Sequence, residues 1–234
     1  MANRNLPNCD ASLTPAWKPY PFPRTKLLDA IKTNRLEGYA DRYAGFAPEY
    51  WCASGGRTHA AHGGFCATVL MTTARQYYQD VLDRSGTGLP TGLHVEFIEP
   101  MPKGVFHIVL RTRQKGNHQT VVQAELVPED PHSNTVYSTA FVRLGSSESN
   151  HIANRQPKLA RLPDRDKDCC RWTDAAYYIA NPPTSSIRVF CPNDRGNPFW
   201  SEKFGGQNCR YQWTKPDQEP NFTFEYLPVL ADLV

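Results

Sequence analysis

Residues 65–82 constrain the fold more strongly than any other stretch of this sequence, because they predict one long helix that is not stable by itself. Apolar residues recur at positions 66, 70, 74, 78 and 82, a spacing that puts them on one helical face. The first half is apolar on nearly every side, whereas one side of the second half carries Arg75, Gln76, Gln79 and Asp80. This pattern predicts a buried beginning and a solvated end. Helical stability in proteins comes mostly from packing, so another part of the chain must cover this helix.

Four strand candidates follow the helix and can supply that cover. They are separated by "EPMPKG", "RQKGNH" and "PEDPHSN", which are dense in turn-forming residues. The strands are expected at residues 93–98, 105–112, 119–127 and 135–144. Connections this short favour an antiparallel meander, and the apolar character of both faces of 105–110 indicates a central strand. With extended segments near 39–43 and 49–52, the pattern predicts an α+β fold whose antiparallel sheet wraps around the helix.

The composition along the chain divides it into four parts. Residues 1–38 are expected to form an arm rich in Pro and polar residues that ends in a short helix at 26–37, and residues 39–145 form the first domain. Residues 146–168 are polar and charged, which is typical of a linker. The remaining residues, 169–234, are expected to contain a short helix at 172–180, a strand at 210–215 and a helical apolar run at 222–234.

Charge and cysteine usage exclude several classes of function. The 26 Lys and Arg residues nearly balance the 23 Asp and Glu residues, and the net charge of +3 does not indicate a nucleic-acid partner. No apolar run approaches the roughly 20 residues of a membrane span, and the N-terminal stretch lacks the apolar core of a secretory signal. We therefore expect a cytoplasmic protein without a membrane partner. The seven cysteines are scattered and lack C-x-x-C spacing, which argues against a zinc site and a disulfide framework.

The tripeptide His62-Gly63-Gly64 stands directly before the long helix. The first amides of a helix lack intrahelical acceptors and carry a partial positive charge. Glycines here let a ligand oxygen approach those amides closely, which can polarise a thioester carbonyl and stabilise its oxyanion. His62 can then donate a hydrogen bond or act as a base. The alternative is structural: the glycines make a tight turn, and His62 caps the helix or packs against it.

The order of these elements resembles the thioesterase-like hotdog superfamily, and within it the acyl-CoA thioesterase II family, whose members contain two hotdog domains. The resemblance rests on "HGGFCATVL", on the long helix and on "GLHVEFIEPMPKGVFHIVLRTRQKGNHQTVVQAELV", and it covers about residues 39–145. The family's strand and turn patterns match at Phe97 to Pro100, Pro102 to Gly104 and Arg111 to Gly116. The resemblance implies that residues 169–234 form a second, incomplete hotdog.

The resemblance also implies a site that combines both ends of the chain. The family's catalytic aspartate lies near the start of the second central helix, in an L-x-x-x-S/A-D setting, and Asp232 in "LPVLADLV" is the matching position. A carboxylate there can orient water for attack on a thioester, whereas the alternative is an ordinary acid on a helix surface. His62 would assist Asp232 in catalysis. The substrate is expected to contact Gly63, Gly64, Phe65 and Gln123, the last from a central strand that faces the helix N-terminus.

The sequence departs from the family pattern after Asp232. Family members carry a Thr or Ser and a Gln on later strands of the second hotdog, and the present sequence stops two residues after Asp232. Either the sequence is incomplete, or the function no longer needs that site, or contacts in a homo-oligomer supply the missing strands. A homo-oligomer is expected, because an incomplete second hotdog leaves a helix uncovered and a sheet edge open.

These features favour an enzyme that hydrolyses an acyl-CoA or a related acyl thioester. A second hypothesis is a hotdog dehydratase, another lyase or a cyclase of secondary metabolism, in which His62 is the acid or base on a non-thioester intermediate. A third is a non-catalytic protein that binds an acyl ligand or a partner chain. No cofactor or metal is expected, and the substrate is a small hydrophobic molecule.

Overall fold

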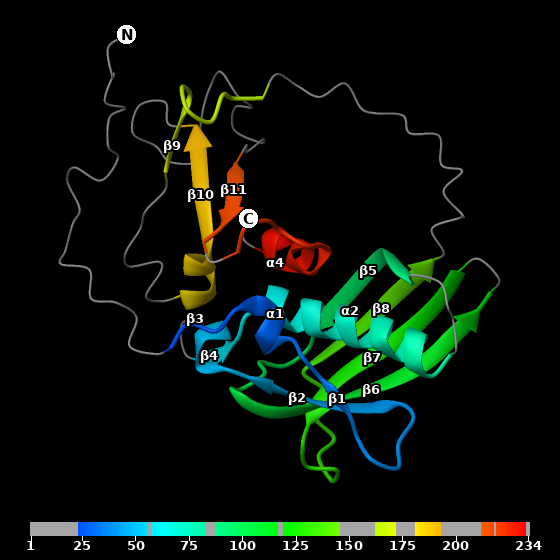
Figure 1. Ribbon diagram of the computed structural model, residues 1–234. Helices are drawn as coiled ribbons and strands as arrows, with labels where there is room; N and C mark the ends of the chain where they lie inside the picture. Colours follow the sequence, from blue (N-terminus) through cyan, green and yellow to red (C-terminus); the bar gives the residue numbers. More distant parts are fainter. Residues whose placement is uncertain are drawn as a thin grey trace. The chain divides into compact units, whose positions relative to one another are not determined.

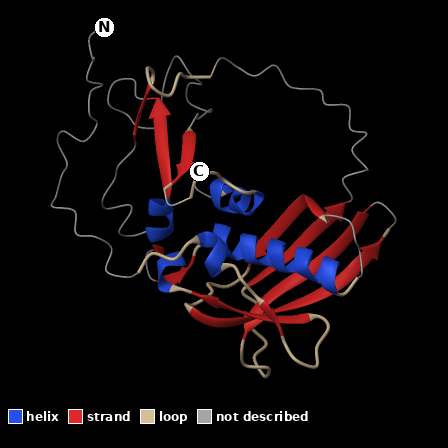
Figure 2. Cartoon of the chain, in the orientation of Figure 1, coloured by secondary structure: helices blue, strands red, loops and turns tan. Residues whose placement is uncertain are grey.

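The computed structural model describes residues 23–55, 58–82, 88–116, 119–145, 162–171, 181–192, 212–217 and 219–232. They belong to two compact units (Figures 1 and 2). The large unit contains residues 22–152 together with 223–234, and the small unit contains residues 153–222. The last twelve residues of the sequence therefore group with the first domain and not with the region that directly precedes them.

The large unit consists of one long helix, α2 (Gly63–Asp80), on a six-stranded sheet (Figure 1). Every strand pair in this sheet is antiparallel. In spatial order the strands are β1 (Asn34–Arg35), β2 (Arg42–Ala47), β6 (Gly104–Lys115), β7 (Gln119–Pro128), β8 (Ser138–Gly145) and β5 (Leu89–Phe97). The α+β hotdog architecture, a sheet wrapped around a central helix, is confirmed.

The core lies between α2 and one face of the sheet. Alternation along β7 (Gln119–Pro128) puts Val122, Ala124 and Leu126 on this face, and all three are fully buried, as a strand covered on one side requires. The first two turns of α2 contribute Phe65, Val69 and Leu70, which are also 0% exposed. The apolar face of the sheet packs against the apolar side of α2, and this packing buries the start of the helix, as the sequence predicts.

The strand order differs from a simple meander. β6, β7 and β8 do follow one another, but β5 pairs with β8 at the far edge of the sheet and not with β6. β6 pairs instead with β2, which precedes the helix in the sequence. β2 and β6 are far apart in the sequence, so the turn residues between β5 and β6 do not indicate that β6 pairs with β2.

The chain before α2 is less regular than the sequence pattern suggests. The helix expected at 26–37 is only α1 (Leu27–Ala30), and β1 follows it. The strand expected near 39–43 begins later, as β2. The extended segment expected near 49–52 is a 3-10 turn, η1 (Glu49–Trp51), followed by β3 (Cys52–Gly55). β3 forms a hairpin with β4 (Thr58–Ala61), which leads directly into α2.

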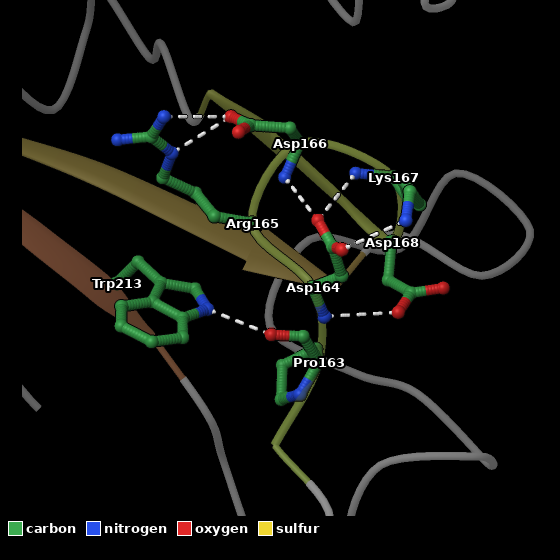
Figure 3. Close-up of polar contacts among 7 residues, drawn as sticks. All are labelled: Pro163, Asp164, Arg165, Asp166, Lys167, Asp168 and Trp213. Atoms are coloured by element: carbon green, nitrogen blue, oxygen red, sulfur yellow. Dashed lines mark hydrogen bonds and ion pairs between the residues drawn. The ribbon is translucent and has the colours of Figure 1, made fainter.

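The small unit contains a three-stranded antiparallel sheet of β11 (Trp213–Pro216), β10 (Ile187–Pro192) and β9 (Cys169–Arg171), with a 3-10 turn, η3 (Pro182–Ser186), before β10. Figure 3 shows the turn that precedes β9, in which Asp164 Oδ1 accepts hydrogen bonds from the Asp166 and Lys167 amides. The Trp213 indole donates to the Pro163 carbonyl at 3.0 Å. β11 overlaps the strand expected at 210–215, while the helix expected at 172–180 lies outside the described residues.

The C-terminal segment of the large unit, residues 224–232, runs beside α2. It comprises a 3-10 turn, η5 (Phe224–Tyr226), and a short helix, α4 (Leu227–Ala231), with Asp232 as its C-cap. These two elements lie within the helical run expected at 222–234. An incomplete second hotdog in residues 169–234 stays a prediction.

Candidate functional site

The N-terminus of α2 is where the structure brings the predicted site residues together. His62 precedes the helix in an extended conformation, and its side chain does not cap the helix. Its backbone amide donates to the Trp51 carbonyl at 2.9 Å. The Gly64 amide donates to Asp232 Oδ2 at 2.6 Å, across 168 positions of sequence. A carboxylate from α4 thus satisfies an amide that the helix itself cannot pair, and the positive end of the helix stabilises its charge.

Gly63 and Gly64 both lie where a larger residue would collide with the C-terminal segment. A Cβ on Gly64 would lie 2.6 Å from Val229 Cα and 3.0 Å from the Pro228 carbonyl oxygen, so only glycine lets α4 approach this closely. A Cβ on Gly63 would lie 2.9 Å from Asp232 Oδ2 and 3.3 Å from Phe97 Cζ. Gly64 therefore sets the distance between the two helices, and Gly63 leaves room for the carboxylate.

His62 is buried beside this carboxylate. The ring is 6% exposed, and Nδ1 lies 3.0 Å from Asp232 Oδ2. Nδ1 makes no well-directed hydrogen bond within the described residues, so the contact is chiefly electrostatic. Burial lowers the pKa of His62 below its ordinary value, and the attraction of Asp232 opposes that shift only in part. The imidazole is therefore neutral at pH 7, which is the form that accepts a proton.

The two oxygens of Asp232 have different surroundings. Oδ2 is held by the Gly64 amide and faces His62, whereas no described residue donates a hydrogen bond to Oδ1. The side chain is 41% exposed, so water can reach the carboxylate. One oxygen is fixed by the protein and the other can accept a hydrogen bond from a water molecule.

A second set of contacts holds the C-terminal segment further along α2. The Thr68 hydroxyl donates to the Glu225 carbonyl at 3.1 Å. The Arg75 guanidinium lies 4.7 Å from the centre of the Phe224 ring and 3.8 Å from Glu225 Oε1. Sequence reasoning missed these residues. Arg75 stands on the polar side of the predicted helix, where its partner cannot be inferred from spacing alone.

Two of the predicted substrate-contacting side chains lie elsewhere. Phe65 is fully buried and stacks on Trp51 with ring centroids 5.9 Å apart, so its side chain belongs to the core. Gln123 alternates with the inward-facing Val122 and Ala124 and thus lies on the face of the sheet away from α2. There it accepts from Arg113 at 2.5 Å and donates to Glu125 at 2.8 Å. The prediction that Gln123 faces the helix N-terminus is wrong.

The described residues contain neither a cluster of metal-binding side chains nor a helix that could cross a membrane. No group of three or more His, Cys, Asp or Glu side chains in the described part of the chain is arranged to hold a metal ion. Within those same ranges, every helix is too short or too polar to span a bilayer.

Comparisons with known proteins agree with this architecture. The profile of the acyl-CoA thioesterase N-terminal domain family matches residues 47–144, which run from the end of β2 almost to the end of β8. Residues 47–144 are a domain of the thioesterase-like hotdog superfamily. This hotdog domain carries His62, Gly63 and Gly64, whereas Asp232 reaches it from outside the matched segment.

Solved structures show the same fold at low sequence identity. A hotdog-fold protein of unknown function from Alicyclobacillus acidocaldarius matches with a TM-score of 0.67 and 17% identity, over 89% of this chain and 69% of that one. A candidate thioesterase II from Thermobifida fusca YX matches with a TM-score of 0.62 and 17% identity, over 91% and 73% of the two chains. A candidate thioesterase from Novosphingobium aromaticivorans matches with a TM-score of 0.64 and 15% identity, over 84% and 70%. No curated protein matches the sequence.

Proposed function

We propose that the protein hydrolyses an acyl thioester, with acyl-CoA as the substrate class, at the N-terminus of α2. The observation that carries the proposal is the meeting of a buried neutral imidazole, a solvent-accessible carboxylate and the first amides of a helix around Gly63. A base, a water-binding oxygen and a partial positive charge are the three elements that thioester hydrolysis requires. The thioesterase-type domain of residues 47–144 supports the reaction class.

In the proposed mechanism, Asp232 Oδ1 accepts a hydrogen bond from a water molecule and orients it toward the thioester carbonyl carbon. As the water oxygen forms its bond to that carbon, its proton passes to the Asp232–His62 pair. The tetrahedral intermediate then collapses, the carbon–sulfur bond breaks, and the leaving thiolate takes a proton back. The products are a carboxylic acid and a free thiol, so atoms and charge balance.

The role of the two glycine amides differs from the sequence expectation. Both were expected to hold the carbonyl oxygen, but the Gly64 amide donates to Asp232. The Gly63 amide lies in the first turn, where no acceptor exists within the helix. We therefore assign the developing oxyanion to Gly63 N–H and to the positive end of α2.

A non-catalytic role is favoured by one observation. Oδ2 of Asp232 is used as a helix cap, and a capping carboxylate alone would stabilise the fold by about 1 kcal/mol. A lyase or cyclase would use the same His62–Asp232 pair to move a proton on a non-thioester intermediate. Neither alternative releases a thiol from an acyl-CoA, so a single assay separates them from hydrolysis.

The homo-oligomeric state and the cytoplasmic location expected from the sequence stay predictions.

The experiment measures thiol release from acyl-CoAs of increasing chain length by the wild-type protein and by Asp232→Asn. We expect turnover by the wild type and a fall of roughly 10²- to 10⁴-fold in kcat for the variant, the usual contribution of general base catalysis. Asp80→Asn is the matched control, because Asp80 is an exposed residue at the other end of α2. Absence of turnover with every chain length, in a folded protein, would contradict the proposal.

A further inference from the structure

A cavity of about 310 Å³ opens beside the candidate site, within the large unit. It lies under the first turn of α2, at the end of the edge strand β5. Its lining includes Ala61, Cys66, Phe97, Ile98, Met101 and Ser138. Burial raises the pKa of the Cys66 thiol to about 12, so this thiol is uncharged at neutral pH. The lining is therefore mostly apolar, as expected for a pocket that binds a hydrophobic ligand.

Phe97 connects this cavity to the carboxylate of the site. Its ring atom Cζ and Asp232 Oδ2 both flank Gly63, at 3.3 Å and 2.9 Å from the position that a Cβ would take. The register of β5 pairs Phe97 with the buried Ser138, so the ring lies on the face of the sheet that α2 covers. A group whose carbonyl sits at Gly63 therefore has the Phe97 ring, and next the cavity, directly beside it.

The exposure of the residues at the mouth also indicates a ligand. Phe97 is 57% exposed and Ile98 is 56% exposed, although both are large and apolar. Adjacent exposed apolar side chains on the rim of a cavity commonly mark a binding surface. A hydrophobic ligand that entered the cavity would cover both of them.

We propose that this cavity binds the acyl group of the substrate and that Phe97 and Ala61 determine which acyl groups fit. This inference rests on the proposed hydrolase function and names its substrate class. Since a 150 Å³ apolar cavity accommodates benzene, a cavity twice that size suits an acyl group on the order of eight to twelve carbons, aliphatic or aromatic. No lining residue in the described part of the chain is cationic, and Glu99 contributes a carboxylate to the wall. Acyl groups that end in a second carboxylate are therefore excluded.

The first test compares decanoyl-CoA with acetyl-CoA in the Ala61→Ile variant. The larger side chain fills the cavity, so kcat/KM for decanoyl-CoA should fall roughly tenfold or more, the effect of losing room for a few methylene groups. Hydrolysis of acetyl-CoA should change much less. Ala60→Ile is the matched control, because Ala60 is the neighbouring residue on the opposite face of β4. Equal chain-length profiles for the two variants would overturn the inference.

A binding measurement separates failure of this inference from failure of the proposed reaction. S-decyl-CoA is a thioether that cannot be hydrolysed, and its affinity is measured by calorimetry for the wild type, Ala61→Ile and Ala60→Ile. Binding that weakens at least about tenfold only in Ala61→Ile supports the cavity, even if no thioester is hydrolysed. Binding that is equal in all three proteins, or absent in the wild type, overturns it, whether or not hydrolysis occurs.

Discussion

The C-terminal segment is attached to α2 at two places that use different chemistry. At the start of the helix, Asp232 accepts the Gly64 amide and lies beside the buried His62. About three turns further along, Arg75 covers the Phe224 ring and pairs with Glu225. The first attachment places a carboxylate against the first amides of α2 and beside a neutral imidazole. The second combines the hydrogen bond from the Thr68 hydroxyl to the Glu225 carbonyl with the contacts of Arg75, and it contains no such pair of acid and base. We therefore propose that the same segment has a catalytic role at the Asp232 end and only an anchoring role at the Phe224 end.

The largest effect that separates the two attachments is expected from Gly63→Ala. The new methyl group would lie 2.9 Å from Asp232 Oδ2, which displaces the carboxylate without touching the α4 backbone. A misplacement of this size lowers kcat by roughly 10²-fold, while the melting temperature should barely change. Steady-state thiol release and thermal unfolding measure the two quantities. An unchanged kcat would mean that the carboxylate is not needed where the structure places it.

Gly64→Ala should act on stability, because its methyl group would meet the α4 backbone at 2.6 Å. Helix propensity alone predicts that this change stabilises the protein by about 1 kcal/mol. Overpacking predicts a loss of about 1–3 kcal/mol instead, so the two effects differ in sign. Chemical denaturation decides between them, with Gly92→Ala as the control, since its nearest contact is the Arg143 side chain at 3.4 Å. A more stable Gly64→Ala protein would contradict the close packing of α4.

The pH dependence of stability should report on His62. Because burial lowers the pKa of His62 in the folded state, the unfolded chain takes up a proton at a higher pH than the folded one. Stability is then lost as pH falls below the ordinary histidine pKa of about 6.5, and the loss ends once the pH lies below the folded-state pKa. His62→Gln should remove this component of the pH profile. Identical profiles for the two proteins between pH 7 and pH 5 would show that His62 titrates normally.

The smallest effect is expected at the second attachment, from Arg75→Ala. Removing the guanidinium eliminates a partly exposed ion pair and a cation–π contact, which together contribute about 0.5–1.5 kcal/mol. Denaturant titration measures the loss, which should shrink with added salt. A loss above roughly 4 kcal/mol, exceptional for a single substitution, would show that the second attachment is structurally dominant.

Local sequence patterns predicted the elements whose stability is decided locally. The helix of α2 and the strands β6 and β7 show clear periodicity between strong turn signals, and the structure contains all three. β5 begins at Leu89, four residues earlier than expected. The prediction started the strand too late because Pro90 and Gly92 are uncommon within strands. The pairing of β5 with β8 depends on contacts between distant residues, so no local signal reveals it.

The same distinction applies to the candidate site. The glycines before α2 point to a helix start that a ligand or another element approaches closely. The reason for Gly64 lies on α4, however, 165 positions away at Val229. Asp232 has no local signal of its own and was identified only through family resemblance. Gln123 was misplaced because a shift of one residue along a strand exchanges the face that α2 covers for the opposite face.

In the proposed mechanism, Asp232 activates water and does not attack the thioester itself. A single-turnover reaction in ¹⁸O-labelled water, with protein in excess over decanoyl-CoA, tests this most directly by mass spectrometry. Water activation predicts one labelled oxygen in the released decanoic acid and none in the peptide that contains Asp232. Label incorporated into Asp232, with unlabelled acid released in the first turnover, would contradict it.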